Sequence, residues 1–205
     1  MSVTYPSRGQ ILAGITAAML VLAACSAAPV RSPDTHYDLE VTMASVSFGT
    51  EATIALRRVD VRGLQSGRSL VIITGTAPVR FQEQRGHFWH VATPTLIERA
   101  FLTAMNDAST DAAFGPSDSF DEVDYRLLLT VSRFAYVLGG EAMVDFDATV
   151  TTSDGDVLLA RSYWGRAPLA GDRPADGVNG LGVALGKAMA VFAGELAAAL
   201  PAGQG

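Results

Sequence analysis

The sequence predicts an α+β domain in which two helices pack on one face of a mixed, mainly antiparallel sheet. Residues 142–152 alternate apolar and polar side chains, as expected of a strand with one buried face. Residues 124–138 and 157–164 flank this strand across short turns, which completes an antiparallel meander. Residues 94–108 and 178–200 instead repeat apolar side chains at helical spacing, so each is expected to cover a sheet.

The composition limits the classes of protein to consider. A chain of 205 residues with 49% hydrophobic and 18% charged residues can bury a sizeable core, and its length suggests one domain. The net charge of -6 disfavours a nucleic-acid partner, because the sequence has no basic stripe to neutralise phosphates. A single cysteine excludes an intrachain disulfide.

The amino-terminal segment predicts export and lipid modification. An apolar run over 11–24 follows Arg8, as in a signal peptide, and it is shorter than the roughly 20 residues that span a bilayer. It ends in Leu22, Ala23, Ala24 and Cys25, which resembles a bacterial lipobox. Cys25 is therefore the expected lipidation site, after cleavage of a signal peptide at 1–24. An ordinary signal peptide with an incidental cysteine is the alternative.

The residues after the lipobox predict a tether and a compartment. Small, polar and proline residues over 25–36 are typical of a flexible tether, which leaves 37–200 as the folded domain. His36 falls in this expected tether. Ser26, by resemblance to enterobacterial sorting signals, favours the outer membrane over the inner one.

The first half of the domain is expected to supply short strands. These lie at 37–41, 53–61, 70–73 and 79–83, and the last of them is expected to end at Gly86. The apolar alternation over 53–61 changes phase at Arg57 and Arg58, which predicts a β-bulge.

The two helices differ in their boundary signals. Thr93 is expected to cap the first helix, with Pro94 at its first position. Residues 110–122 are expected to form a loop with at most a short strand, and 165–177 a second loop. The final helix could be transmembrane by length, yet its charged residues favour a core helix. Gly182 and Gly186 permit close packing on the sheet or on a partner helix.

We find no motif for catalysis, metal or cofactor binding, and expect no enzyme activity. His87 and His90 would point to opposite faces of a strand and have no acidic or cysteine partner at ligand spacing. Four aspartates lie on a strand and its turn, without the spacing of a calcium loop. These are Asp145, Asp147, Asp154 and Asp156.

The order of these segments resembles the ABC-type transport auxiliary lipoproteins, the lipoprotein partners of Mce-type lipid transport systems. The paraquat-inducible intermembrane transport lipoprotein is one member. The likeness covers about 37–200, and its most specific part runs from Gly86 through His90 into the helix that follows. Further parts are the lipobox, the sequence Tyr37-Asp38-Leu39, the strand over 54–61, the segment 79–105, the segment from Asp124 to Phe134, and Arg161-Ser162-Tyr163.

The resemblance implies a transport subunit without catalysis of its own. The expected partners are an Mce-domain protein with an ABC permease and ATPase, the membrane through the lipid anchor, and phospholipid as a candidate cargo. Phe88 and Trp89 are the expected docking residues, because exposed aromatic side chains dominate interface energetics; core packing is the alternative role. A homo-oligomer remains open. The competing function is a stand-alone periplasmic lipoprotein that binds a lipid or another hydrophobe in an internal pocket.

Overall fold

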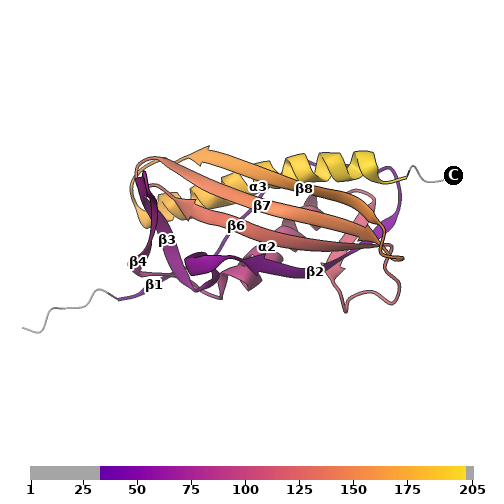
Figure 1. The fold of residues 1–205 in the computed structure, drawn as a ribbon, viewed down its shortest axis with the longest axis horizontal. Helices are drawn as coiled ribbons and strands as arrows, with labels where there is room; N and C mark the ends of the chain where they lie inside the picture. The colour runs from indigo at the N-terminus through magenta and orange to yellow at the C-terminus, as the bar shows by residue number, and fades with distance from the viewer. Residues whose placement is uncertain (1–32, 202–205) are drawn as a thin grey trace, which may run out of the picture. The chain divides into compact units, whose positions relative to one another are not determined.

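The computed structural model describes residues 33–201, so the predicted signal peptide, the lipobox and Cys25 lie outside the described residues. The described chain forms an eight-stranded sheet with two α-helices and one short 3-10 helix, η1 (Figure 1). The elements are β1 (Thr35–Tyr37), β2 (Ala52–Val61), η1 (Gly63–Ser66), β3 (Ser69–Thr76), β4 (Val79–Trp89), α2 (Thr93–Ala108), β5 (Ala112–Pro116), β6 (Tyr125–Tyr136), β7 (Glu141–Thr152), β8 (Val157–Pro168) and α3 (Pro174–Ala199).

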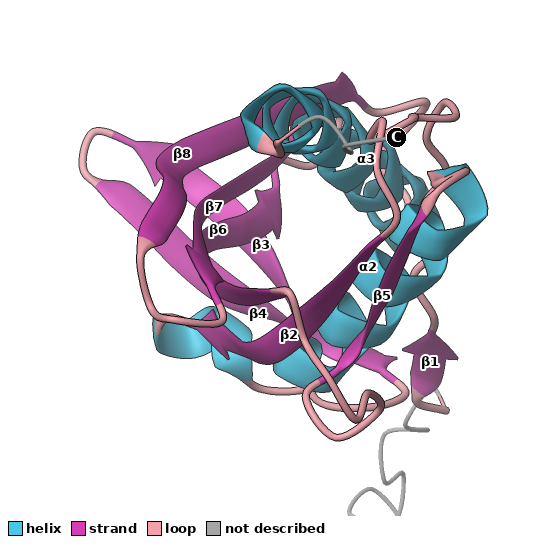
Figure 2. Cartoon of the chain, turned by 90° about the vertical axis from the view of Figure 1, so that its right-hand side faces the viewer, coloured by secondary structure: helices cyan, strands magenta, loops and turns pink. Residues whose placement is uncertain are grey.

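The predicted fold class is confirmed. Strand β6 lies at the centre of a mixed sheet that is not closed, with β7 and β8 antiparallel on one side. On its other side β6 pairs in parallel with β2 over most of its length and with β3 at one end. Helices α2 and α3 cover the concave face of this sheet, whose curvature Figure 2 shows end-on.

The predicted meander is confirmed with small changes at the strand ends, of which the largest is at the end of β8. Along β7 the side chains of Val144, Phe146, Ala148 and Val150 are buried, and the residues between them are half-buried on the other face. Strand β8 continues to Pro168, beyond the predicted end at Trp164, because β7 offers partners as far as Glu141. The first residues of the expected loop 165–177 are therefore strand.

The predicted bulge in β2 is confirmed. Leu56 pairs with Leu127 and Arg58 with Leu128, so the residue between them has no partner in the register with β6. The extra residue restores the alternation of apolar side chains toward the core. Val59, after the bulge, is therefore buried, as Ile54 is before it.

The expectation that β4 ends at Gly86 is wrong. Gly86 adopts a φ of 75°, a conformation that glycine reaches without strain, and the strand continues to Trp89. The register with β3 shifts around this point, so Gly86 lies in an irregular stretch rather than at a strand end. The continuation gives β1 its partner among the described strands, with Tyr37 opposite Trp89.

The first strand lies earlier than the predicted 37–41. Residues Thr35 and His36, expected in the tether, belong to β1. The chain over 38–42, which we call the strap, has no regular secondary structure and crosses α3 instead. An ideal Cβ on Gly182 would overlap the carbonyl oxygen of Glu40, and one on Gly186 would lie 2.5 Å from that of Thr42. The glycine pair thus serves tight packing within the chain.

The start of each helix also differs from expectation. The cap of α2 is Ala92, and Thr93 is the first helical residue, with its hydroxyl donating to the Gly67 carbonyl at 2.7 Å. Helix α3 begins at Pro174 rather than at 178, because Asp176 and Arg173 form a capping box there.

This cap makes the stability of α3 dependent on pH. The Arg173 guanidinium donates to the Asp176 carboxylate at 3.0 Å, and this bond lowers the pKa of Asp176. A lowered folded-state pKa stabilises the protein above the ordinary aspartate value, and that contribution is lost as pH falls through the folded-state pKa. We expect Asp176→Asn to lower the melting temperature at pH 7 and to flatten its decline toward pH 3. Asp172→Asn is the exposed control, and equal pH profiles for both variants would contradict the assignment.

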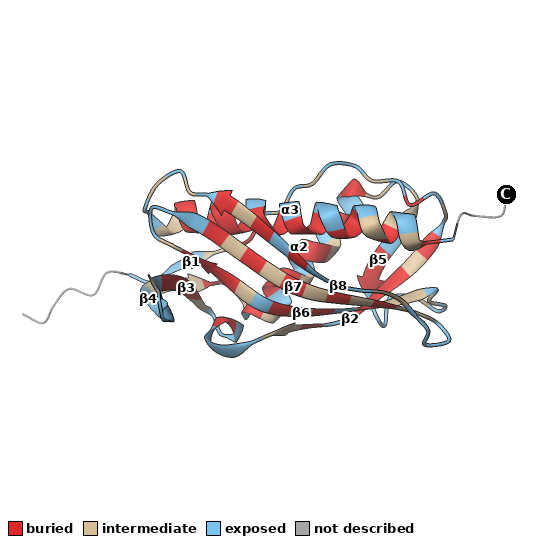
Figure 3. Cartoon of the chain, turned by 45° about the horizontal axis from the view of Figure 1, so that its top comes forward, coloured by how far each residue is buried: buried red, intermediate tan, exposed pale blue. Residues whose placement is uncertain are grey.

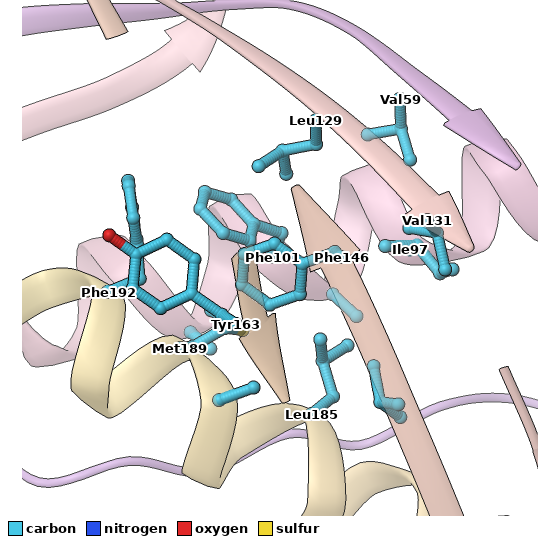
Figure 4. Packing of buried hydrophobic residues seen from close by; sticks show 14 of the residues in the cluster. Val59, Ile97, Phe101, Leu129, Val131, Phe146, Tyr163, Leu185, Met189 and Phe192 are labelled. Carbon is cyan, nitrogen blue, oxygen red and sulfur yellow. The ribbon is translucent and has the colours of Figure 1, made fainter. Parts of the chain in front are cut away.

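The core fills the space between the sheet and the helices. Tyr163 of β8 and Phe192 of α3 pack edge to face at 5.5 Å, and Phe101 of α2 and Phe146 of β7 join them (Figure 4). Figure 3 shows buried residues concentrated where α3 faces the strands. By length and composition α3 could cross a membrane, but just over half of its apolar window, 56%, is buried in the domain.

Candidate functional site

The two expected docking residues occupy different environments. Trp89 is only 2% exposed and packs against Phe134 at 5.7 Å between ring centroids. The expectation that it is exposed is wrong, because β4 continues past Gly86 and turns this side chain toward the core. Phe88 is half-buried and lies against the ring of His36 from β1 at 5.8 Å. Of the pair, only Phe88 offers a partner any surface.

The neighbouring histidines have structural partners. Nδ1 of His87 lies 3.1 Å from the hydroxyl of Tyr37. Nε2 of His90 lies 3.0 Å from Arg99, whereas its buried Nδ1 lies 3.4 Å from Asp38 and makes no hydrogen bond. Within residues 33–201, no group of three histidine, cysteine, aspartate or glutamate side chains could hold a metal ion.

Two of the three carboxylates that line one surface cleft accept hydrogen bonds from backbone amides. Glu51, Asp111 and Asp124 line a surface cleft of about 580 Å³. Asp111 accepts from the amides of Phe48 and Gly49, and the Phe48 bond is the main reason that the pKa of Asp111 is lowered. Asp124 accepts from the amide and hydroxyl of Thr53 at 2.8 Å. Asp111 and Asp124 therefore hold loops in place.

The aspartates of β7 form a polar network on the face of the sheet away from the helices. Asp145 binds Arg166 at 2.5 Å and Arg133 at 3.4 Å. Ser162 donates to Asp147 at 2.6 Å. Asp154 and Asp156 lie in and beside the turn that precedes β8, separate from this network.

The clefts found among the described residues give no support to the stand-alone lipid-binding function. The clefts found in the described chain open to the surface, and large aromatic side chains occupy the region between sheet and helices (Figure 4). A chain that enclosed a lipid would need an apolar cavity of a few hundred Å³ in that region.

The most exposed large apolar side chain of the described residues is Trp164, with 68% of its surface accessible. It lies on the outer face of β8, directly beside Asp145 of β7. Strand β8 pairs only with β7 among the described strands, so its other edge is not covered by a strand. An indole in this position leaves a large apolar area in contact with solvent.

A groove of about 410 Å³ runs between this strand and the last helix. Its lining residues are Arg161, Ser162, Tyr163, Trp164, Val191 and Glu195, which we call the Trp164 groove. Val191 of α3 is 55% exposed and faces the groove across from β8. The groove is therefore mainly apolar, with charged residues only at its rim.

The charges at the rim are satisfied within the domain. Glu195 accepts from Arg161 at 3.0 Å and from the hydroxyl of Tyr163 at 2.8 Å. Burial, and then this bond to Glu195, raise the pKa of Tyr163, so the phenol stays protonated and donating. The paired charges hold β8 against α3 and leave the groove without an unpaired ion. Such a groove suits an apolar side chain of a protein partner better than an ion or a nucleic acid.

Sequence reasoning missed Trp164, although the sequence contains a signal for it. Tyr163 and Trp164 are adjacent in a strand, so only one of them can point into the core. In the meander, the polar residues Ser162 and Arg166 share the phase of Trp164. A tryptophan in the polar phase of a strand marks an exposed aromatic side chain.

Comparisons with known proteins agree on the fold. A family model described as "ABC-type transport auxiliary lipoprotein component" matches residues 37–193. The crystal structure of protein XCC0632 from Xanthomonas campestris, of family DUF330, is similar with a TM-score of 0.63 and 17% identity, over 80% of this chain and 96% of that one. An uncharacterized protein of known structure is similar with a TM-score of 0.63 and 12% identity, over 82% and 98% of the two chains. None of the curated proteins compared with the chain matches it significantly.

Proposed function

Because this chain belongs to the family of ABC-type transport auxiliary lipoprotein components, we propose that it is a lipid-anchored subunit of an ABC/Mce-type intermembrane lipid transport system. Lipid on Cys25 would hold it at the outer membrane, with the folded domain facing the periplasm. The observation that carries this proposal is the family match over nearly the whole domain, residues 37–193. That family is a class of transport auxiliary components in the cell envelope and not a class of enzymes.

Three features of the chain support the finer parts of the proposal. The lipobox ending at Cys25 provides the anchor, and Ser26 favours the outer membrane. The packed interior argues for a protein that assists transport through its surface, instead of carrying lipid inside. Within this system the ATPase would supply energy, and the Mce-domain protein would supply the apolar conduit for phospholipid.

We place the docking of the Mce-domain partner on the Trp164 groove. A tryptophan beside an apolar groove with a polar rim matches the composition of an interface hot spot. Trp89 cannot serve this purpose from the core, and Phe88 offers only part of its ring. Phe88 therefore remains a second, weaker docking proposal at the β1–β4 edge of the sheet.

The test is capture of the transporter by this chain and by its variants. We expect the native lipoprotein to co-purify with an Mce-domain protein and with the ABC permease. Trp164→Ala is expected to weaken the Mce complex by about 2 kcal/mol, roughly 30-fold in Kd, because a central tryptophan contributes most of such an interface. The measurement is titration of the Mce-domain protein onto reconstituted lipoprotein.

A matched control uses another exposed apolar residue. Leu64→Ala in η1 removes a side chain that is 46% exposed and lies outside the groove, so it should leave the affinity unchanged. Phe88→Ala tests the second docking residue in the same titration. If no Mce or ABC component co-purifies, the proposed function is wrong. Equal affinities for native chain and Trp164→Ala would move the docking site elsewhere.

A further inference from the structure

The β3–β4 hairpin carries exposed apolar side chains that the transport partner proposal leaves unexplained. Every residue from Val79 to Glu83 is exposed, although the segment is a regular strand paired with β3. Val79 is 51% and Phe81 38% exposed, and alternation places both on one face of the strand. A phenylalanine and a valine on a projecting hairpin have little structural reason to face water.

These side chains lie beside a small buried apolar cluster on the sheet face away from the helices. Phe81 pairs with Ile73 across the hairpin. Ile73 and Val71 pack with Ala135 of β6 in a second small cluster, separate from the main core. Neither helix covers this face, so Val79 and Phe81 extend the cluster toward solvent. We call the exposed pair Val79 and Phe81 the hairpin patch.

The charge around the hairpin patch is opposite to that of the whole chain. The chain has a net charge of -6, yet β4 carries Arg80 and Arg85 against the single acid Glu83. Both arginines are exposed, and no salt bridge involves either of them within the described residues. Arg85 shares the strand phase of Phe81, and Arg80 points to the opposite face. The two unpaired arginines therefore flank the hairpin on both faces, where they complement the anionic phospholipid headgroups around an inserted tip.

The point where the tether enters the domain gives the hairpin access to the bilayer. Thr35 lies ten positions after Cys25, and a chain of that length reaches at most about 35 Å. It enters at β1, which pairs with His87–Trp89 at the base of the same β4 strand. The tip of the hairpin at Val79 is eight residues from His87, about 26 Å along the strand. The tether is therefore long enough for Val79 to touch the membrane that holds Cys25.

The opposite end of the domain lies beyond that reach. Figure 1 shows β1, β3 and β4 at one end of the described chain, and the turn between β7 and β8 at the other. A strand of twelve residues such as β8 covers about 40 Å, more than the extended tether.

We propose that the hairpin patch docks on the anionic surface of the anchoring membrane, with Val79 and Phe81 inserted among the headgroups and Arg80 and Arg85 beside their phosphates. This inference rests on the proposed lipidation of Cys25. Docking would fix the orientation of the domain, which a flexible tether alone leaves free. The end opposite the hairpin then points into the periplasm, away from the membrane.

A fluorescent probe on the lipidated full chain tests this. Because Cys25 is the only cysteine and its thiol is acylated, an introduced cysteine is the only free thiol. We would label Phe81→Cys with NBD and reconstitute the protein in vesicles of phosphatidylethanolamine and phosphatidylglycerol. Val157→Cys is the matched control, an exposed apolar residue, 63% accessible, at the far turn. Circular dichroism checks the fold of both variants.

We expect the probe at residue 81 to shift to the blue and to be quenched by headgroup spin-labelled lipid, while the probe at 157 stays in water. Replacing Arg80 or Arg85 with glutamine should lower the ratio of docked to undocked hairpin about fivefold for each residue. Vesicles of phosphatidylcholine alone should remove both contributions and lower the ratio about 25-fold without any substitution.

Three results would overturn the proposal. If palmitate labels Cys25 but the probe at 81 stays in water on anionic vesicles, the hairpin does not dock, while the proposed function is unaffected. If the probe is shielded only after the Mce-domain protein is added, a protein covers the patch instead of lipid. Absence of palmitate on Cys25 would refute the anchor itself, and with it the proposed function.

Discussion

Replacement of Cys25 by serine is expected to abolish lipidation and to release the protein from stable membrane attachment. The thiol is the acceptor for the diacylglycerol, and a serine hydroxyl is not sufficiently nucleophilic to replace it. Each acyl methylene buried in the bilayer contributes about 0.8 kcal/mol, so a triacylated chain is held far more firmly than one acyl group could hold it. The check is palmitate labelling combined with membrane fractionation before and after an alkaline wash.

The uncleaved apolar segment is the one complication of this experiment. The run over 11–24 would remain on the serine variant, but it is shorter than the roughly 20 residues that a stable span requires. We therefore expect the alkaline wash to extract that variant and to leave the native chain in the membrane. Ser26→Asp is the control, because it keeps the thiol and should change only the membrane in which the protein resides. Unchanged fractionation and labelling of the serine variant would disprove the anchor.

Gly182→Ala is expected to destabilise the domain by about 3 kcal/mol, the upper end for an overpacked core. The added methyl group would overlap the Glu40 carbonyl oxygen of the strap. Backbone atoms cannot rotate away as a flexible side chain can, so the strap or α3 has to move. The strap also buries Leu39 in the core, and its displacement would open that contact.

Gly194→Ala provides a control in the same helix with the opposite expected sign. A Cβ at Gly194 meets no other atom within 4 Å, and the residue is exposed. Alanine there should stabilise α3 by about 0.5–1 kcal/mol, since glycine in a helix interior costs that much relative to alanine. Urea unfolding followed by circular dichroism measures both variants. Equal effects at the two positions would show that the strap does not pack on Gly182 as described.

The sequence predicted well those elements whose pattern is local. The meander from β6 to β8 follows from apolar alternation and short turns, and the bulge in β2 follows from a change of phase at Arg57 and Arg58. Both helices were predicted from their apolar stripes, with errors only at their ends. In each case the residues adjacent in the sequence are enough to predict the element.

Errors arose where a distant segment decides the local structure. Gly86 was expected to end a strand, but β1 supplies a partner that extends β4 through it. Residues 38–41 were expected to form a strand, but the groove offered by Gly182 and Gly186 binds them as an irregular strap. Neither partner can be recognised from the segment's own residues.

The same distinction between local patterns and distant contacts applies to the candidate sites. The sequence by itself determined the lipobox at Cys25, the fold class and the resemblance to a transport family, because covalent processing signals and residue periodicity are written along the chain. Only the tertiary structure decided which tryptophan is accessible, since the face on which a side chain lies depends on what packs against its strand. Packing buried Trp89 and left Trp164 in solvent, and it left the β3–β4 hairpin uncovered near the end of the tether.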